Sequence, residues 1–283
     1  MRGLGVVLAF WPIAVGAEVP RVVTDIPPVT ALVSEVMGDL GKPLQMLEKG
    51  ADEHDIQLRP SQVAALANAG VLIWIGPELT PGLEGARKAA PDLVSLALLD
   101  DPATHRQDYA DGGVNPHAWL DPGNAKAWLG VIATALSARD PDHAAVYQAN
   151  ADLARAGLET LDAALAARLK PLTDKPFITY HDAYGYFVTH YALTYVGALA
   201  TGEAAQPGAA RISGLQRRVA RDHVVCAFPE VQHDPGLLAP FADQGVTLGA
   251  ALDPVGALLD PGPKAYAALM TNLTDALVSC LTP

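Results

Sequence analysis

The chain has 283 residues, a length that suits two domains of ordinary size. Its 31 acidic and 19 basic side chains leave a formal net charge of −12 at pH 7. A chain this acidic is a poor ligand for nucleic acid and for anionic lipid surfaces, because like charges repel. The same charge attracts cations, although only as a general field.

Residues 1–17 have the pattern of a secretory signal peptide: Arg2 precedes an apolar stretch, and Ala17 offers a cleavage site. The stretch is shorter than the roughly 20 residues that a membrane-spanning helix needs, and a buried N-terminal strand is the alternative. No cysteine follows the cut to take a lipid anchor. We therefore expect an exported mature protein that begins near Glu18, diffuses freely and does not span a membrane.

Strand and helix patterns alternate through residues 18–139, which predicts an N-terminal α/β lobe with a parallel sheet and helices on both faces. The apolar run Val71–Ile75, for example, is typical of a strand buried on both faces. The expected elements are strands at 22–24, 44–47, 71–75 and 93–96, helices at 28–37, 60–67, 77–88 and 121–139, and a polar, mobile loop at 100–113.

Residues 140–170 predict one long linker helix. The stretch 141–169 has no internal proline, and its leucines recur at helical spacing. At 1.5 Å per residue it would extend roughly 40 Å, enough to bridge two lobes. The alternation then resumes in a C-terminal α/β lobe at 171–283. Its expected elements are strands at 177–180, 194–199, 224–228 and 246–248, and helices at 183–191, 212–222, 234–244 and 263–280.

The two cysteines, Cys226 and Cys280, predict a disulfide bond, because exported proteins with a small, even cysteine count usually pair them. The closed loop of about 54 residues would stabilise the fold by about 3–4 kcal/mol on the chain-entropy model. A cysteine-based metal site is the alternative, but two cysteines so widely spaced lack the CxxC signature.

Three histidines, His54, His117 and His181, each lie beside a turn or helix start, roughly 63 residues apart. At least two of them follow strands, where ligands of open α/β sheets bind. Three neutral imidazoles brought together make a site for a borderline-soft divalent metal, zinc first. Two would come from the first lobe and one from the second, so the metal would lie in the cleft between lobes. Each histidine alone is more simply a loop donor, and only the set predicts a site.

Carboxylates are the candidates for a fourth ligand. Glu53 adjoins His54, and Asp253 follows a strand, although Asp253 could instead cap a turn. Glu230 follows another strand and could accept an imidazole N–H. The remaining histidines are interpreted as solvent-exposed or structural; they are His105, His143, His190, His223 and His233.

Four segments, in order along nearly the whole mature chain, resemble motifs of the metal-binding substrate-binding proteins of ABC importers, most of all the zinc-specific ZnuA type. They are residues 50–61, 115–122, 181–187 and 252–256. The resemblance implies two α/β lobes joined by a long rigid helix, with the metal between them. It also implies zinc ligands at His54, His117 and His181, and water, Glu53 or Asp253 in the fourth position.

The resemblance bears on metal choice and on the disulfide. Manganese and iron relatives tend to carry a carboxylate where this chain has His181, and a third imidazole favours zinc. The zinc members have a disulfide in the second lobe that Cys226 and Cys280 match. Many also have a loop rich in histidine before the second motif, whereas residues 100–113 contain only His105 among four aspartates, which puts a zinc-gathering role of this loop in doubt.

Together these features predict a periplasmic, monomeric, non-enzymatic protein that captures one Zn²⁺ per chain and delivers it to the permease of an inner-membrane ABC transporter, with a zinc chaperone as a further candidate partner. Binding should weaken below about pH 6 as histidines protonate. One alternative is a Mn²⁺ or Fe²⁺ importer component. Others are an adhesin of the same fold and a zinc hydrolase with Glu53 or Glu230 as base, although no His-Glu-x-x-His motif is present.

Overall fold

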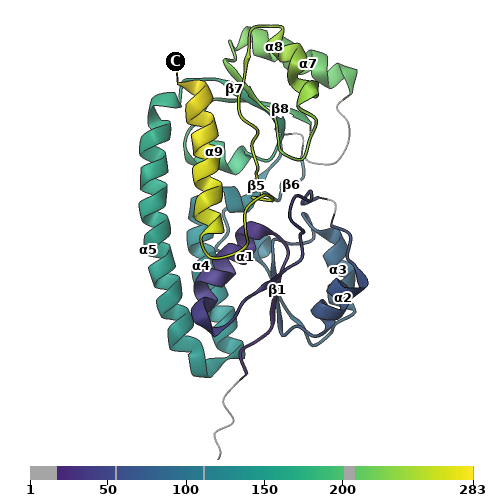
Figure 1. Cartoon of the computed structure of the whole chain (residues 1–283), viewed down its shortest axis with the longest axis vertical. Coiled ribbons are helices and arrows are strands. Elements are labelled where there is room, and N and C mark those ends of the chain that lie inside the picture. The colour runs from purple at the N-terminus through teal and green to yellow at the C-terminus, as the bar shows by residue number, and fades with distance from the viewer. Residues whose placement is uncertain (1–17, 55, 111, 201–207, 283) are drawn as a thin grey trace, which may run out of the picture.

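The computed structural model describes residues 18–54, 56–110, 112–200 and 208–282, and the predicted signal peptide lies outside them. Two four-stranded parallel sheets form the two ends of the molecule, and a layer of helices runs alongside both (Figure 1). The predicted α/β class with two parallel sheets is confirmed. The lobe boundaries at 139/140 and 170/171 stay predictions.

The first sheet has the strand order β2-β1-β3-β4. Its central strand β3 is buried on both faces, as predicted: Val71 and Ile73 pack in the main core, and Leu72 and Trp74 pack in a second core beneath two helices. The elements of this part are β1 (Val22–Thr24), β2 (Leu44–Gln45), β3 (Val71–Trp74) and β4 (Val94–Ala97), with helices α2 (Pro60–Ala67) and α3 (Pro81–Lys88).

The helical layer joins the two ends. It consists of α1 (Pro27–Met37), α4 (Pro122–Arg139), α5 (Ala144–Leu169) and α9 (Ala265–Leu281). Helix α5 has 26 residues, or about 39 Å, and runs most of the length of the molecule (Figure 1). The last helix, α9, packs against both α1 and α5. Of the leucines at helical spacing, Leu158, Leu165 and Leu169 are buried, whereas Leu153 is 76% exposed.

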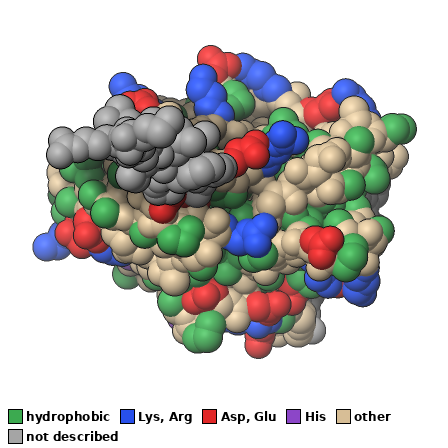
Figure 2. Space-filling view, turned by 90° about the horizontal axis from the view of Figure 1, so that it is seen from below, with side chains coloured by type: hydrophobic (Ala, Val, Ile, Leu, Met, Phe, Trp, Pro, Cys, Tyr) green, Lys and Arg blue, Asp and Glu red, His purple; other side chains and the backbone are tan. Residues whose placement is uncertain are grey.

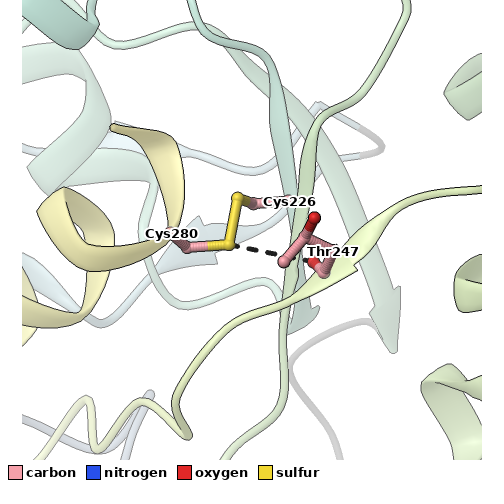
Figure 3. The surroundings of a disulfide bond; sticks show 3 residues. All are labelled: Cys226, Thr247 and Cys280. Atoms are coloured by element: carbon pink, nitrogen blue, oxygen red, sulfur yellow. Dashed lines mark hydrogen bonds between the residues drawn. A yellow bond between two sulfur atoms is a disulfide. The ribbon is translucent and has the colours of Figure 1, made fainter. Parts of the chain in front are cut away.

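The second sheet has the order β10-β9-β7-β8. Its elements are β7 (Phe177–His181), β8 (Tyr195–Ala200), β9 (Cys226–Phe228) and β10 (Thr247–Leu248), with α6 (Gly185–His190), α7 (Ala209–Arg221) and α8 (Ala239–Ala242). The predicted disulfide is confirmed: Cys226 of β9 bonds to Cys280 of α9, with 6.2 Å between their Cα atoms (Figure 3). It ties the last helix of the chain to the second sheet.

The predicted loop at 100–113 contains more structure than expected. Strand β5 (Gln107–Asp108) pairs antiparallel with β6 (Val114–Asn115). Gly112 and Gly113 close this hairpin with φ values of +99° and +86°, which only glycine adopts readily. The Tyr186 hydroxyl accepts the backbone N–H of Gln107 at 2.8 Å, so the hairpin is anchored to α6.

Other elements also differ from the sequence prediction; the helix expected at 77–88, for example, begins at Pro81. The strand expected at 44–47 ends at Gln45, and the helix expected at 234–244 is a 3₁₀ turn, Pro235–Leu238, followed by α8. Pro240 lacks an N–H and therefore fits the first turn of a new helix better than the interior of a long one. Among the described helices, none is both long and apolar enough to cross a membrane. On the lower face of the molecule acidic and basic side chains are interspersed (Figure 2).

Candidate metal site

The ends of two strands and two loops bring one cluster of ligand-type side chains together. Glu53 and His54 lie in the loop after β2, His117 follows β6, and His181 is the last residue of β7. One ligand atom from each of the four lies within 4.8 Å of all the others. Of the three predicted histidines, His181 ends a strand of a parallel sheet, where open α/β sheets bind ligands, whereas His54 and His117 come from the loops after β2 and after the antiparallel strand β6.

The spacing of the imidazoles suits a small metal ion. The Nε2 atoms of His54 and His117 are 3.2 Å apart. Two nitrogens bound to one tetrahedral zinc at 2.0–2.1 Å lie about 3.3–3.4 Å apart, so little movement would be needed. The ring centroids form a nearly equilateral triangle with sides of 4.9, 5.1 and 5.2 Å. Such a triangle leaves room at its centre for one ion.

Burial keeps two of the rings neutral. Desolvation, helped by the charge of His181, lowers the pKa of His54 to about 4 and the pKa of His117 well below its usual value. A neutral imidazole presents the free electron pair that a metal needs, so neither ring has to lose a proton at pH 7 before it binds.

Asn115 sets the tautomer of His117. Its side-chain oxygen accepts the ring Nδ1–H at 2.8 Å and the backbone N–H of His117 at 3.0 Å. With the proton on Nδ1, the electron pair lies on Nε2, the atom that faces His54. Sequence reasoning missed this role, although the position of Asn115 two residues before the histidine is typical of a side chain that accepts from the backbone two residues on.

Glu230 lies behind His181, as the sequence indicated. Its carboxylate is 3.6 Å from His181 Nδ1 and 3.5 Å from His233 Nε2, and it accepts the hydroxyl of Tyr184 at 2.7 Å. Burial lowers the pKa of His181, but the Glu230 carboxylate outweighs it and the net shift is upward. The other nitrogen, His181 Nε2, is buried without a hydrogen-bond partner among the described residues. A buried ring nitrogen that has no hydrogen-bond partner and lies among other imidazoles is typical of a side chain that binds a metal.

The two candidate carboxylates are placed differently. Glu53 is inside the cluster and only 3% exposed, and desolvation raises its pKa to about 8. Asp253 is not among the clustered residues; its two oxygens accept the backbone N–H groups of Ala257 at 2.9 Å and Leu258 at 3.1 Å. In this structure Asp253 therefore caps a turn, the alternative role that its position in the sequence allowed.

The other histidines lie outside the cluster. His105 contacts Asp121 and His143 contacts Asp140, and the His105 side chain is 62% exposed. His233 stacks on Tyr180, with ring centroids 4.3 Å apart, and adjoins Glu230. It is therefore closer to the site than the sequence indicated.

A family model described as "Zinc-uptake complex component A periplasmic" (ZnuA) matches residues 22–280. This chain belongs to the ZnuA family. It is 45% identical to the high-affinity zinc uptake system protein ZnuA of Paracoccus denitrificans, over 94% of this chain and 93% of that protein. The Brucella suis protein of the same name is 31% identical over 95% of this chain and 94% of its own length. The family is one of substrate-binding transport proteins.

Solved structures of ZnuA-like proteins share the fold. The periplasmic zinc-binding protein TroA from Treponema pallidum has a TM-score of 0.84 and 21% identity, and covers 93% of this chain and 99% of its own. A crystal structure of ZnuA has a TM-score of 0.78 and 25% identity, over 91% and 99%. A Mn²⁺ complex of FpvC from Pseudomonas aeruginosa is just as similar, with a TM-score of 0.83, 20% identity and coverage of 93% and 99%. The fold alone therefore does not decide the metal.

Proposed function

We propose that this protein captures one Zn²⁺ in the periplasm and delivers it to the permease of an ABC importer, with the metal held by His54, His117, His181 and Glu53. The observation that carries this proposal is the cluster itself, in which three imidazoles and a carboxyl group lie with ligand atoms within 4.8 Å of one another. Three nitrogen ligands and one oxygen suit zinc better than manganese, which prefers oxygen. Family membership supports the transport role.

The surrounding groups prepare the site for a dication. The neutral rings of His54 and His117 and the free Nε2 of His181 offer three electron pairs, Glu230 lies beside them, and Glu53 supplies negative charge once its proton is lost. Because metal binding must displace any proton on Glu53 or on His181 Nε2, affinity falls as the pH is lowered. Zinc is the cargo here, and the protein acts as a carrier rather than an enzyme.

The route into the periplasm and the division into lobes belong to the same proposal. Residues 1–17 act as the leader, and the lobes at 18–139 and 171–283 are joined by the helix at 140–170. A single main core reaches from Val22 in β1 to Leu281 in α9 and includes buried side chains of α5. A shared core of this kind resists wide opening, so we expect modest lobe motion on binding and a permease that promotes release.

The test is a metal competition. Mature protein stripped of metal receives equal, limiting Zn²⁺ and Mn²⁺, and the bound metals are counted after gel filtration. We expect one zinc per chain, which His54→Ala and His181→Ala should abolish and His143→Ala, a change far from the cluster, should not. Retention of manganese instead would refute the zinc assignment. Release of product from ester, peptide or phosphoester substrates by the zinc form would indicate a hydrolase.

A further inference from the structure

A partly buried charge network lies outside the metal cluster and joins three segments of the chain. His190, the last residue of α6, is held between two aspartates: its Nδ1 is 2.9 Å from an oxygen of Asp121, and its Nε2 is 2.8 Å from an oxygen of Asp162. Asp121 is the N-cap of α4, and Asp162 belongs to the long helix α5. The side chains of all three are at most 24% exposed.

The contacts of His190 define its protonation state. An ionised carboxylate only accepts hydrogen bonds, and a neutral imidazole has one N–H to donate. The Nε2 contact with Asp162 is a hydrogen bond, which places a proton on Nε2, and the Nδ1 contact with Asp121 is a close approach of 2.9 Å between ion-pair partners. A neutral ring would direct an electron pair at a carboxylate oxygen less than 3 Å away, which is repulsive. The geometry thus favours an imidazolium ion between two carboxylates.

The neighbouring charges support this state. Lys126 of α4 contacts the other oxygen of Asp162 at 2.9 Å, and His105 contacts the other oxygen of Asp121 at 3.3 Å. With His190 protonated, one histidine and one lysine balance the two aspartates. Burial raises the pKa of Asp121 and of Asp162, but the hydrogen bonds that each aspartate accepts outweigh burial. The pKa of each is therefore lowered, and both stay ionised.

Other titratable groups around His190 carry no competing charge inside the network. The phenols of Tyr186 on α6, of Tyr191 directly after α6 and of Tyr266 on α9 have raised pKa values because of burial and nearby acids, so they stay neutral. Glu159 and Lys170 line the adjoining groove but are exposed. Bonds from the two aspartates raise the pKa of His190 itself.

The network connects the segments that carry two of the proposed ligands. Asp121 lies four residues after His117, and His190 lies on the helix that follows His181. We propose that His190 is a proton-dependent clasp that holds the segment of His181 against the segment of His117, and so acts as a positioning residue for the metal site. The clasp is complete while His190 carries both ring protons and is lost as the pH rises and His190 gives one up. The effect of the clasp on zinc affinity rests on the proposed function, whereas the existence of the clasp does not.

The protonation state is tested first, without metal. Two-bond ¹H–¹⁵N spectra of metal-free, ¹⁵N-labelled protein, with His190 assigned from a His190→Gln sample, should show both ring nitrogens protonated at pH 7.5. An ordinary histidine, with a pKa near 6.5, is about nine-tenths neutral at that pH. The Asp162→Asn variant should shift the titration midpoint of His190 to lower pH. A neutral ring at pH 7.5, or an unchanged midpoint in Asp162→Asn, would overturn the proposal.

Positioning is then tested through zinc affinity, measured by chelator competition at pH 7.0 and pH 9.5. His190→Gln should bind zinc about tenfold more weakly than wild type at pH 7.0, as is typical when a group that orients a ligand is lost. The gap should shrink at pH 9.5, because the wild-type clasp is then also open. His143→Gln, which alters the contact of His143 with Asp140 just before α5, should match wild type at both values.

The possible outcomes are distinct. Equal affinity of His190→Gln and wild type at pH 7.0, or a gap that does not change with pH, would overturn the positioning role. If the His190→Gln protein does not fold, Asp162→Asn takes its place in the same assay with the same expected gap. If wild type binds no zinc, the proposed function fails, while the spectra still decide whether the clasp exists.

Discussion

Glu53→Gln is expected to abolish the release of about one proton that accompanies zinc binding at pH 7. Burial raises the pKa of the Glu53 carboxyl group to about 8, although the charge of His181 lowers it in part. A group with that pKa is about nine-tenths protonated at pH 7, whereas a carboxylate bound to metal carries no proton. Each zinc that binds through Glu53 therefore displaces roughly 0.9 proton from this side chain.

The same proton sets a free-energy cost. Removing it at one pH unit below the pKa opposes binding by about 1.4 kcal/mol, or tenfold in affinity. The contribution has a definite sign: affinity rises with pH until the pKa of about 8 is passed, and then levels off. The amide of the Glu53→Gln variant has no proton to lose, so this part of the pH dependence should disappear while the part due to the histidines remains.

The assay is isothermal titration calorimetry in buffers of different ionisation enthalpy, where the dependence of the observed heat on the buffer counts protons. The matched control is Glu48→Gln, since Glu48 lies on the same loop but pairs with Arg59 on the surface. We expect the control to release as many protons as wild type. If Glu53→Gln also does, and keeps full affinity, then Glu53 is not a ligand and water completes the site.

Three further outcomes are expected. Replacing Cys226 and Cys280 by serine should destabilise the fold by up to about 4 kcal/mol in urea unfolding, because the disulfide closes a loop with a sequence separation of 54 residues. The variant should still bind one zinc. An unchanged unfolding midpoint would contradict this prediction. Asp25→Asn should lower the free energy of unfolding by about 1–3 kcal/mol. The Asp25 carboxylate accepts two buried backbone N–H groups, one of them from Ile75, whereas an amide has only one acceptor oxygen. Unfolding of wild type and variant at the same denaturant concentration would refute this reasoning. Glu230→Gln should weaken zinc binding at least about tenfold in chelator competition, because Glu230 lies beside His181. Unchanged affinity would mean that His181 is not a ligand.

Much of the local structure follows from short-range patterns. The apolar run at Val71–Ile75 became a buried strand and Pro60 began a helix, because strand burial and the missing N–H of proline act within a few residues. The sequence predicts a loop at 100–113 where the structure has a hairpin at 107–115, because two-residue strands have too short a pattern to recognise and the Gly112-Gly113 pair is the main local sign of a turn.

In the metal site, too, some features follow from the sequence and others from the fold. The sequence by itself identified His54, His117 and His181 as a set, because each lies in a local context that marks a strand end or a helix start, and because their motifs resemble those of a known family. The carboxyl group that joins the histidines was decided by tertiary structure, because Glu53 and Asp253 were equal candidates along the chain. The fold buries Glu53 in the cluster and bonds Asp253 to the backbone of a turn.

The contacts made by the groups beside the proposed ligands were also decided by the fold, although the sequence had indicated Glu230. Glu230 lies 49 residues beyond His181 in the chain, and Asp162 lies 28 residues before His190, yet each pair is in contact. Residue types and spacing determine what chemistry a chain can supply, because that chemistry belongs to single side chains. Protonation states, tautomers and burial depend on charges and solvent within a few ångströms, and only the packing of distant segments brings those together.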